Sequence, residues 1–240
     1  MNIVKVKDYK ALSEEAFSLF KSVISANPAP VIGFATGSSP VGLYELICYD
    51  YIKNGTSYKN MKTFNLDEYV GLDVSSDQSY IYFMKHNLFD HIDVNPKNIN
   101  IPNGIAPDIE KECKRYSALL ASSSIDLQIL GIGANGHIGF NEPNTPFTST
   151  THKVKLTDKT IQDNSRFFDD IEQVPKYAIT MGIAEIMNAK KILIIANGKN
   201  KAKAVFDMVK GPVSESCPAS ILRRHPDAVL IADEDACSLL

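Results

Sequence analysis

Three side chains of the sequence have the types and spacing that proton transfer requires. Asp67 and Glu68 directly follow the apolar run 62–66. Burying a charge there costs free energy unless the charge is paired or has a function. His137 comes five residues before Glu142, and the glycines between them allow the two side chains to meet. A carboxylate can hold one imidazole tautomer, and imidazole exchanges protons near neutral pH. Together these residues predict an acid–base site, although each alone could be an ordinary loop residue.

One loop of the sequence is suited to an anion such as a phosphate group. It separates a predicted strand from a predicted helix, so its free amides and the helix dipole point toward the same place. Ser39 is predicted to cap that helix and Pro40 to occupy its first position. A well-capped loop without a ligand is the alternative. The loop consists of Thr36, Gly37, Ser38 and Ser39.

Two basic residues could bind the same phosphate. Lys201 is expected in the first turn of a helix that follows the apolar run 191–196. Arg166 directly precedes two phenylalanines in a polar stretch, and its planar guanidinium could hold a phosphate through two hydrogen bonds. An exposed lysine, and an arginine whose stem packs on Phe167, are the alternatives.

The glycine-rich segment 131–136 matches GxGxxG, the pattern associated with dinucleotides. Its context does not fit, because Pro143 and further glycines make a poor helix start. The stretch 158–163, where a ribose-binding carboxylate should end a second strand, is a polar run instead. Nicotinamide binding is therefore the weakest option. We expect the glycines to let the backbone approach a ligand, with Gly136 among the substrate-binding residues.

The elements that must position these residues follow from short apolar runs separated by helical patterns. Continuous rather than alternating hydrophobicity predicts a mostly parallel sheet that is buried on both faces. We therefore expect one doubly wound, Rossmann-like α/β domain over residues 1–240, with ligands beyond the carboxyl ends of the strands. The polar stretch at about 152–181 is a possible lid. The apolar runs are 30–35, 62–66, 127–132, 177–181, 191–196 and 228–232, and helices are expected from 40, from 77, over 109–121 and over 199–209.

Composition excludes several classes of protein. The chain has 240 residues, 44% of them hydrophobic and 22% charged, which is typical of a globular domain. Its net charge is −3 and its basic residues are scattered, so a nucleic-acid partner is not expected. A signal peptide and a membrane-spanning apolar run are absent from the sequence pattern. A cytoplasmic location is the expectation.

With these residues assembled, the sequence resembles the glucosamine-6-phosphate deaminase (glucosamine-6-phosphate isomerase) family. The similarity runs nearly from end to end. Two of the matching pieces are long, ungapped and in the family's order, which makes them specific together. The matching pieces are 35–40, 64–72, 131–133 with 135–143, 164–168 and 198–201.

The resemblance implies conversion of glucosamine 6-phosphate and water to fructose 6-phosphate and ammonium, in amino-sugar catabolism and without a metal or organic cofactor. The aspartate at the position of Asp67 would move a proton between C2 and C1. The histidine matching His137, supported by Glu142, would assist opening of the pyranose ring. Phosphate would be held by the loop matching residues 37–39, with Arg166 and Lys201.

Two departures from the family pattern matter. Many members have aspartate where this sequence has Asn135, which carries no charge to stabilise an imidazolium. Asn135 can still accept a hydrogen bond from imidazole, and we expect the histidine either to rely more on Glu142 or to be less basic. The segment 148–155 also lacks the basic arrangement of allosterically activated hexamers. We therefore expect no activation by N-acetylglucosamine 6-phosphate, and a monomer or small homo-oligomer.

Two other functions remain as alternatives. A 6-phosphogluconolactonase-like hydrolase resembles this fold, but its Gly-His is usually followed by Thr-Ala-Ser-Leu, whereas residues 138–142 read Ile-Gly-Phe-Asn-Glu. A non-catalytic sugar-phosphate sensor would not need Asp67, His137 and Glu142. The deaminase is the function that the sequence favours.

Overall fold

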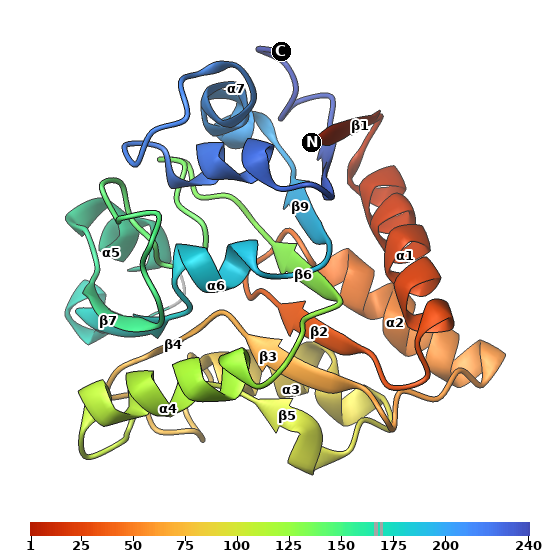
Figure 1. Cartoon of the computed structure of the whole chain (residues 1–240), viewed down its shortest axis with the longest axis horizontal. Coiled ribbons are helices and arrows are strands. Elements are labelled where there is room, and N and C mark those ends of the chain that lie inside the picture. Colours follow the sequence, from red (N-terminus) through yellow and green to blue (C-terminus); the bar gives the residue numbers. More distant parts are fainter. Residues whose placement is uncertain (166–167, 169) are drawn as a thin grey trace.

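A parallel sheet forms the centre of this computed structural model, which describes residues 1–165, 168 and 170–240 (Figure 1). Within those residues the sheet has seven strands in the order β1-β10-β9-β6-β2-β3-β5, and every neighbouring pair is parallel. The strands are β1 (Asn2–Val6), β2 (Val31–Phe34), β3 (Lys62–Asn65), β5 (Ile99–Asn100), β6 (Leu127–Leu130), β9 (Ile192–Ala196) and β10 (Ala228–Asp233). The predicted doubly wound, mostly parallel sheet is confirmed.

Both faces of the sheet are buried, which explains why its strands are apolar throughout. In β9, Leu193 and Ile195 belong to one apolar core, whereas Ile192 and Ile194 belong to another on the opposite face. The first core includes residues of α1 (Tyr9–Ala26), α2 (Val41–Asn54) and α3 (Tyr80–Asn87), and the second includes residues of α4 (Ile109–Ala121), α6 (Ile183–Met187) and α7 (Ala202–Lys210). Helices therefore cover the sheet on both sides, as expected.

A second, antiparallel sheet lies beside the first, with β7 and the short helix α5 at the left of Figure 1. Its order is β4-β8-β7, formed by β4 (Asp67–Tyr69), β8 (Tyr177–Thr180) and β7 (His152–Lys155), and α5 spans Asp158–Asn164. The sequence did not predict this sheet. Its strands β7 and β8 lie near the two ends of the stretch 152–181, whose action as a lid stays a prediction.

Leu66 is the single residue between β3 of the large sheet and β4 of the small one. Its amide donates to the carbonyl of Phe34 in β2, at 3.1 Å, and its carbonyl accepts from the amide of Met181, directly after β8, at 2.6 Å. The backbone of Leu66 is therefore bonded to both sheets. Asp67, the next residue, begins β4 and pairs with Thr180.

Two predicted helix starts are corrected by the structure. α2 begins at Val41 with Pro40 at its N-cap, and Ser39 donates its hydroxyl to Oδ1 of Asn197, at 2.7 Å, instead of capping the helix. α3 begins at Tyr80 rather than Asp77, because the side chain of Ser79 caps it. A capping residue was predicted only for the first of these helices, and there the tertiary contact with Asn197 takes the Ser39 hydroxyl away from the helix.

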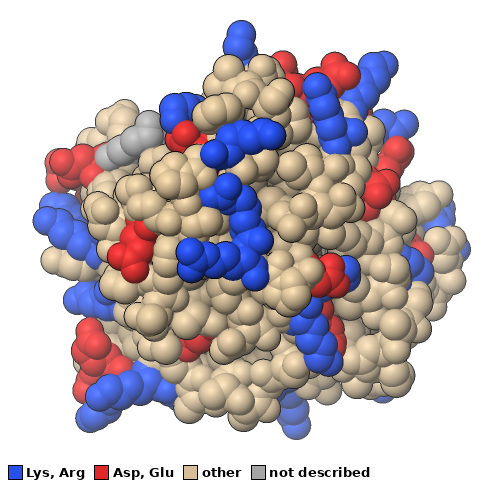
Figure 2. Space-filling model, turned by 45° about the horizontal axis from the view of Figure 1, so that its top comes forward, with Lys and Arg blue, Asp and Glu red and all other residues tan. Residues whose placement is uncertain are grey.

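The molecular surface is mixed in charge. Figure 2 shows basic and acidic side chains interspersed over one face, with a small group of basic side chains near its centre. Within the described part of the chain, every helix is too short or too polar to cross a bilayer.

Candidate active site

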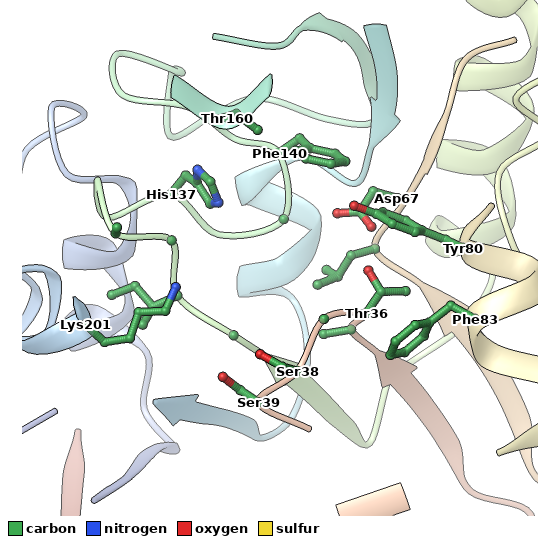
Figure 3. Close-up of a pocket in the computed structure, with 18 of the residues that line it drawn as sticks. Thr36, Ser38, Ser39, Asp67, Tyr80, Phe83, His137, Phe140, Thr160 and Lys201 are labelled. Atoms are coloured by element: carbon green, nitrogen blue, oxygen red, sulfur yellow. The ribbon is translucent and has the colours of Figure 1, made fainter. Parts of the chain in front are cut away.

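A cavity of about 720 Å³ lies at the carboxyl ends of the parallel strands, beside the small sheet. The segments that follow four strands line it, which is where ligands bind in open α/β sheets. Figure 3 shows Asp67 and His137 on different walls, with Ser38, Ser39 and Lys201 on the side below them. The lining residues from these segments are Ala35 to Ser39 after β2, Leu66 and Asp67 after β3, Gly131 to Ala134 and His137 after β6, and Asn197, Gly198, Asn200 and Lys201 after β9.

Asp67 is a buried carboxylic acid that faces this cavity. The residue is 6% exposed, and burial, followed by the nearby charge of Glu68, raises the pKa of Asp67 to about 8. The backbone turns close to it at Gly139, whose φ of 57° favours glycine. A Cβ at Gly139 would lie 3.5 Å from Oδ2 of Asp67 and 2.9 Å from the hydroxyl of Thr180. The wall around the carboxyl group is therefore closely packed.

Glu68 points away from the cavity and holds α3 in place. Its carboxylate accepts backbone hydrogen bonds from Tyr69, Tyr80 and Ile81, at 2.8, 2.9 and 3.0 Å. Burial raises the pKa of Glu68, and these three donors oppose the rise. Adjacent strand residues face opposite ways. Of the two acidic residues, only Asp67 therefore lines the cavity.

His137 and Glu142 lie in contact in the loop that follows β6. Nδ1 of His137 is 3.3 Å from Oε2 of Glu142. Because a carboxylate is an acceptor, this contact assigns the ring proton to Nδ1 and leaves the lone pair of Nε2 free to accept a proton. The ring packs over Gly133, where a Cβ would lie 2.3 Å from Nε2. That glycine thus makes room for the imidazole, a role that the motif alone did not indicate.

Asn135 supports the pair differently from what the sequence suggested. Its Nδ2 donates to Oε2 of Glu142, at 2.7 Å, and its Oδ1 accepts from the backbone amide of His137, at 3.2 Å. The hydrogen bond from imidazole that Asn135 could accept is not the one formed, because Nδ1 of the ring lies against Oε2 of Glu142 instead. Asn135 therefore holds the loop and the carboxylate, and the imidazole has Glu142 as its partner.

Glu142 remains charged despite its burial. Burial alone would raise the pKa of Glu142, but the hydrogen bond and charge of His137, with hydrogen bonds from Thr160 and Asn135, hold it below its usual value. Thr160 lies in α5, 18 residues further along the chain, and lines the cavity. Sequence analysis missed Thr160, because nothing local links it to Glu142.

The predicted phosphate site is partly assembled by the structure. Gly37 has a φ of 97°, and a Cβ there would meet no atom within 4 Å, so the backbone is open to the cavity. Lys201 approaches from the turn after β9. Gly136 is not among the lining residues, and its amide donates to the carbonyl of Gly133 at 2.9 Å. Arg166 lies outside the described residues.

Aromatic side chains form another wall of the cavity. The rings of Tyr80 and Phe140 are stacked with centroids 6.0 Å apart, and Tyr69 packs on both, at 4.8 and 5.7 Å. Phe83 and Phe168 also line the cavity. The sequence did not single out Tyr80 as a residue of the cavity. Among the described residues, no group of three or more His, Cys, Asp or Glu side chains could hold a metal ion.

Comparison with known proteins identifies the family of the chain. Residues 7–231 match the family described as "Glucosamine-6-phosphate isomerases/6-phosphogluconolactonase". A solved 6-phosphogluconolactonase from Trypanosoma brucei shares the fold, with a TM-score of 0.80 and 17% identity over 100% of this chain and 98% of that one. The fold and the site thus define a protein of this isomerase and lactonase class.

Closer relatives identify the branch within that class. A glucosamine-6-phosphate deaminase of Clostridium novyi (strain NT) is 52% identical over the full length of both chains. A solved structure described as a monomeric glucosamine-6-phosphate deaminase is 44% identical, with a TM-score of 0.98 over 100% of both chains. The chain belongs to the glucosamine-6-phosphate deaminase family.

Proposed function

We propose that the protein converts glucosamine 6-phosphate and water to fructose 6-phosphate and ammonium, with Asp67, His137 and Glu142 as its acid–base residues. One observation carries the assignment of residues. A buried carboxyl group and an imidazole held by a second carboxylate face a single cavity beside an open glycine loop. Aldose–ketose isomerisation needs two such groups. The imidazole transfers protons at the oxygen atoms, and the carboxyl group transfers a proton between the carbon atoms.

His137 opens the sugar ring. With Nδ1 engaged by Glu142, Nε2 takes the proton of the O1 hydroxyl while the bond from C1 to the ring oxygen breaks. The ring oxygen then receives a proton and becomes the C5 hydroxyl. The buried carboxylate stabilises the imidazolium that forms in between, a role that the uncharged Asn135 cannot fill.

Asp67 moves the proton between carbons. The open chain carries an aldehyde at C1, which acidifies the hydrogen on C2, and the Asp67 carboxylate removes that proton. The proton returns to C1, one hydrogen of the amino group passes to O1, and an imine forms at C2. Water adds to this imine and ammonia leaves, which forms the ketone of fructose 6-phosphate. A carboxyl group with a pKa near 8 is a far stronger base than an exposed aspartate, so it suits a weakly acidic C–H group.

The phosphate fixes the substrate at the other end of the cavity. The amides of residues 37–39, the ammonium of Lys201 and the guanidinium of Arg166 are the proposed ligands, and Thr36 lines the same wall. Binding energy from this remote group orients C1 and C2 against the acid–base residues.

One assay tests this function. The protein is incubated with glucosamine 6-phosphate without added cofactor, and ammonia and fructose 6-phosphate are measured together. Equal amounts of both products are expected. Hydrolysis of 6-phosphogluconolactone without ammonia release would identify a lactonase instead, and binding without turnover would identify a sensor.

We also propose that the protein acts as a monomer without allosteric activation. The solved relative described as monomeric, which this chain matches along its whole length, supports this proposal. Light scattering should give a mass near 26.5 kDa, and rates should depend hyperbolically on substrate. A sigmoidal curve that N-acetylglucosamine 6-phosphate makes hyperbolic would refute it. The cytoplasmic location stays a prediction.

A further inference from the structure

The second carboxylate oxygen of Glu142 is held by a hydroxyl from α5. Oε2 accepts hydrogen bonds from Asn135 and His137, whereas Oε1 accepts a hydrogen bond from Oγ1 of Thr160. Thr160 is 4% exposed and lines the cavity. Figure 3 shows it on the same side of the cavity as His137. The contact therefore joins α5 to the loop that carries the acid–base pair.

A second threonine supports the same hydroxyl. Oγ1 of Thr157 lies 2.9 Å from Oγ1 of Thr160, and 3.5 Å from Oε1 of Glu142. The shorter contact directs the Thr157 proton to the Thr160 oxygen, so that Thr160 accepts one hydrogen bond while it donates another. A hydroxyl engaged in this way is a stronger donor. The two threonines thus form a short chain of hydrogen bonds that ends on the carboxylate.

We propose that Thr160 is a positioning residue for ring opening, holding Glu142 so that His137 presents Nε2 to the sugar. The inference rests on the proposed function of this pair. The contact between His137 and Glu142 is already 3.3 Å long, so a small rotation of the carboxylate would break it. Without Thr160, Oε1 would be left with the longer, 3.5 Å contact to Thr157, and the more weakly held carboxylate would turn away or take up a proton.

This arrangement also makes α5 part of the site. Glu142 and His137 belong to the loop after β6, but the donor that fixes them belongs to a helix of the segment predicted as a lid. The ring-opening pair is therefore complete only when α5 lies against the cavity.

Thr160→Ala and Thr160→Ser test the role of the hydroxyl, because the two variants differ by one oxygen atom. Thr160→Ala should lose about tenfold in kcat with KM changed less than about twofold, since the hydrogen bond goes to a charged group. Thr160→Ser should restore most of the rate. Glucitol 6-phosphate, which has no ring to open, should bind the alanine variant as tightly as the wild type. Equal rates for the two variants, or weakened glucitol 6-phosphate binding, would overturn the inference.

Thr63→Val is the matched control for loss of a buried threonine hydroxyl. Thr63 is fully buried in β3, and its Oγ1 has no hydrogen-bond partner among the described residues. The kcat of Thr63→Val should equal that of the wild type. A loss of kcat as large as that of Thr160→Ala would show that loss of any buried threonine hydroxyl lowers the rate, and would overturn the proposal. If the wild type itself releases no ammonia, the proposed function fails. If the wild type is active and Thr160→Ala is equally active, only this inference fails.

Discussion

Asp67 and Glu68 are consecutive carboxyl groups with opposite tasks. Asp67 faces the cavity, whereas Glu68 holds the backbone amides of Tyr69, Tyr80 and Ile81 on the other side of the strand. Because the charge of Glu68 also contributes to the high pKa of Asp67, the residue that anchors α3 tunes the residue proposed to act as the base.

Glu68→Gln separates these two effects. The pKa of Asp67 should fall when the neighbouring charge is removed, so the carboxylate form appears at lower pH and the acid limb of kcat/KM moves downward from about pH 8. The loss of a charged acceptor for the amides should lower the free energy of unfolding by about 1–3 kcal/mol. Both are measured on one preparation, by a pH–rate profile and by urea unfolding. An acid limb that stays in place would contradict the electrostatic link.

Asp67→Asn should abolish turnover while inorganic phosphate still binds. It should also alter the dependence of stability on pH. The pKa of Asp67 is raised in the folded state, so between about pH 4 and pH 8 the unfolded chain releases a proton that the folded chain keeps. The wild type therefore loses stability across this window, and the variant does not. The melting temperature of Asp67→Asn should rise relative to the wild type from pH 4 to pH 8. A constant difference would place the ionisation elsewhere.

Glu142→Gln should lower kcat by about 10²-fold and change the shape of the pH–rate profile, because the imidazolium loses its buried counter-charge. Glu185→Gln is a suitable control. Glu185 accepts hydroxyl hydrogen bonds from Ser117 and Thr151 but does not line the cavity. Its substitution should reduce stability and leave kcat unchanged. An unaltered profile in Glu142→Gln would count against the assigned pair.

Gly133→Ala should displace the imidazole. The new methyl group would lie 2.3 Å from Nε2 of His137, so the ring must move, and kcat should fall at least about tenfold with the fold intact. Circular dichroism checks that the fold is intact and steady-state kinetics give kcat. A kcat equal to that of the wild type would argue against the packing of His137 on Gly133.

Lys201→Met should reduce kcat/KM by about 10²-fold and weaken inhibition by inorganic phosphate, because a direct charge on the phosphate is lost. Lys203→Met, two residues away, removes only an exposed pair with Asp207 and should have little effect. Equal inhibition constants for the two variants would remove Lys201 from the proposed phosphate site.

The sequence predicted those parts of the fold that bury apolar residues without interruption. β9 and β10 consist of buried residues throughout, so their hydrophobicity was continuous and their parallel pairing followed. β7 is half exposed and β1 mostly so, and their weak patterns did not mark strands. α1 was not assigned although Leu12, Ala16 and Phe20 recur at helical spacing, so its signal was present in the sequence.

For the site, the sequence could predict the residues that stand at strand ends. Asp67 and His137 line the cavity because the carboxyl ends of parallel strands converge, and their catalytic roles stay predictions. Thr160 and Asn197 were not found, because their partners, Glu142 and Ser39, are brought to them only by the tertiary fold. The capping role of Ser39 was wrong for the same reason.

The backbone hydrogen bonds of Leu66 to both sheets limit the length of substrate that the site can bind. The glycine loop proposed to bind the phosphate follows β2 of the large sheet. The proposed base, Asp67, belongs to the small sheet and comes one residue after Leu66. The distance between the proposed phosphate-binding loop and the proposed base is thus determined by the main chain. Lengthening or shortening the chain by one residue at Leu66 would displace the Asp67 carboxylate relative to the glycine loop.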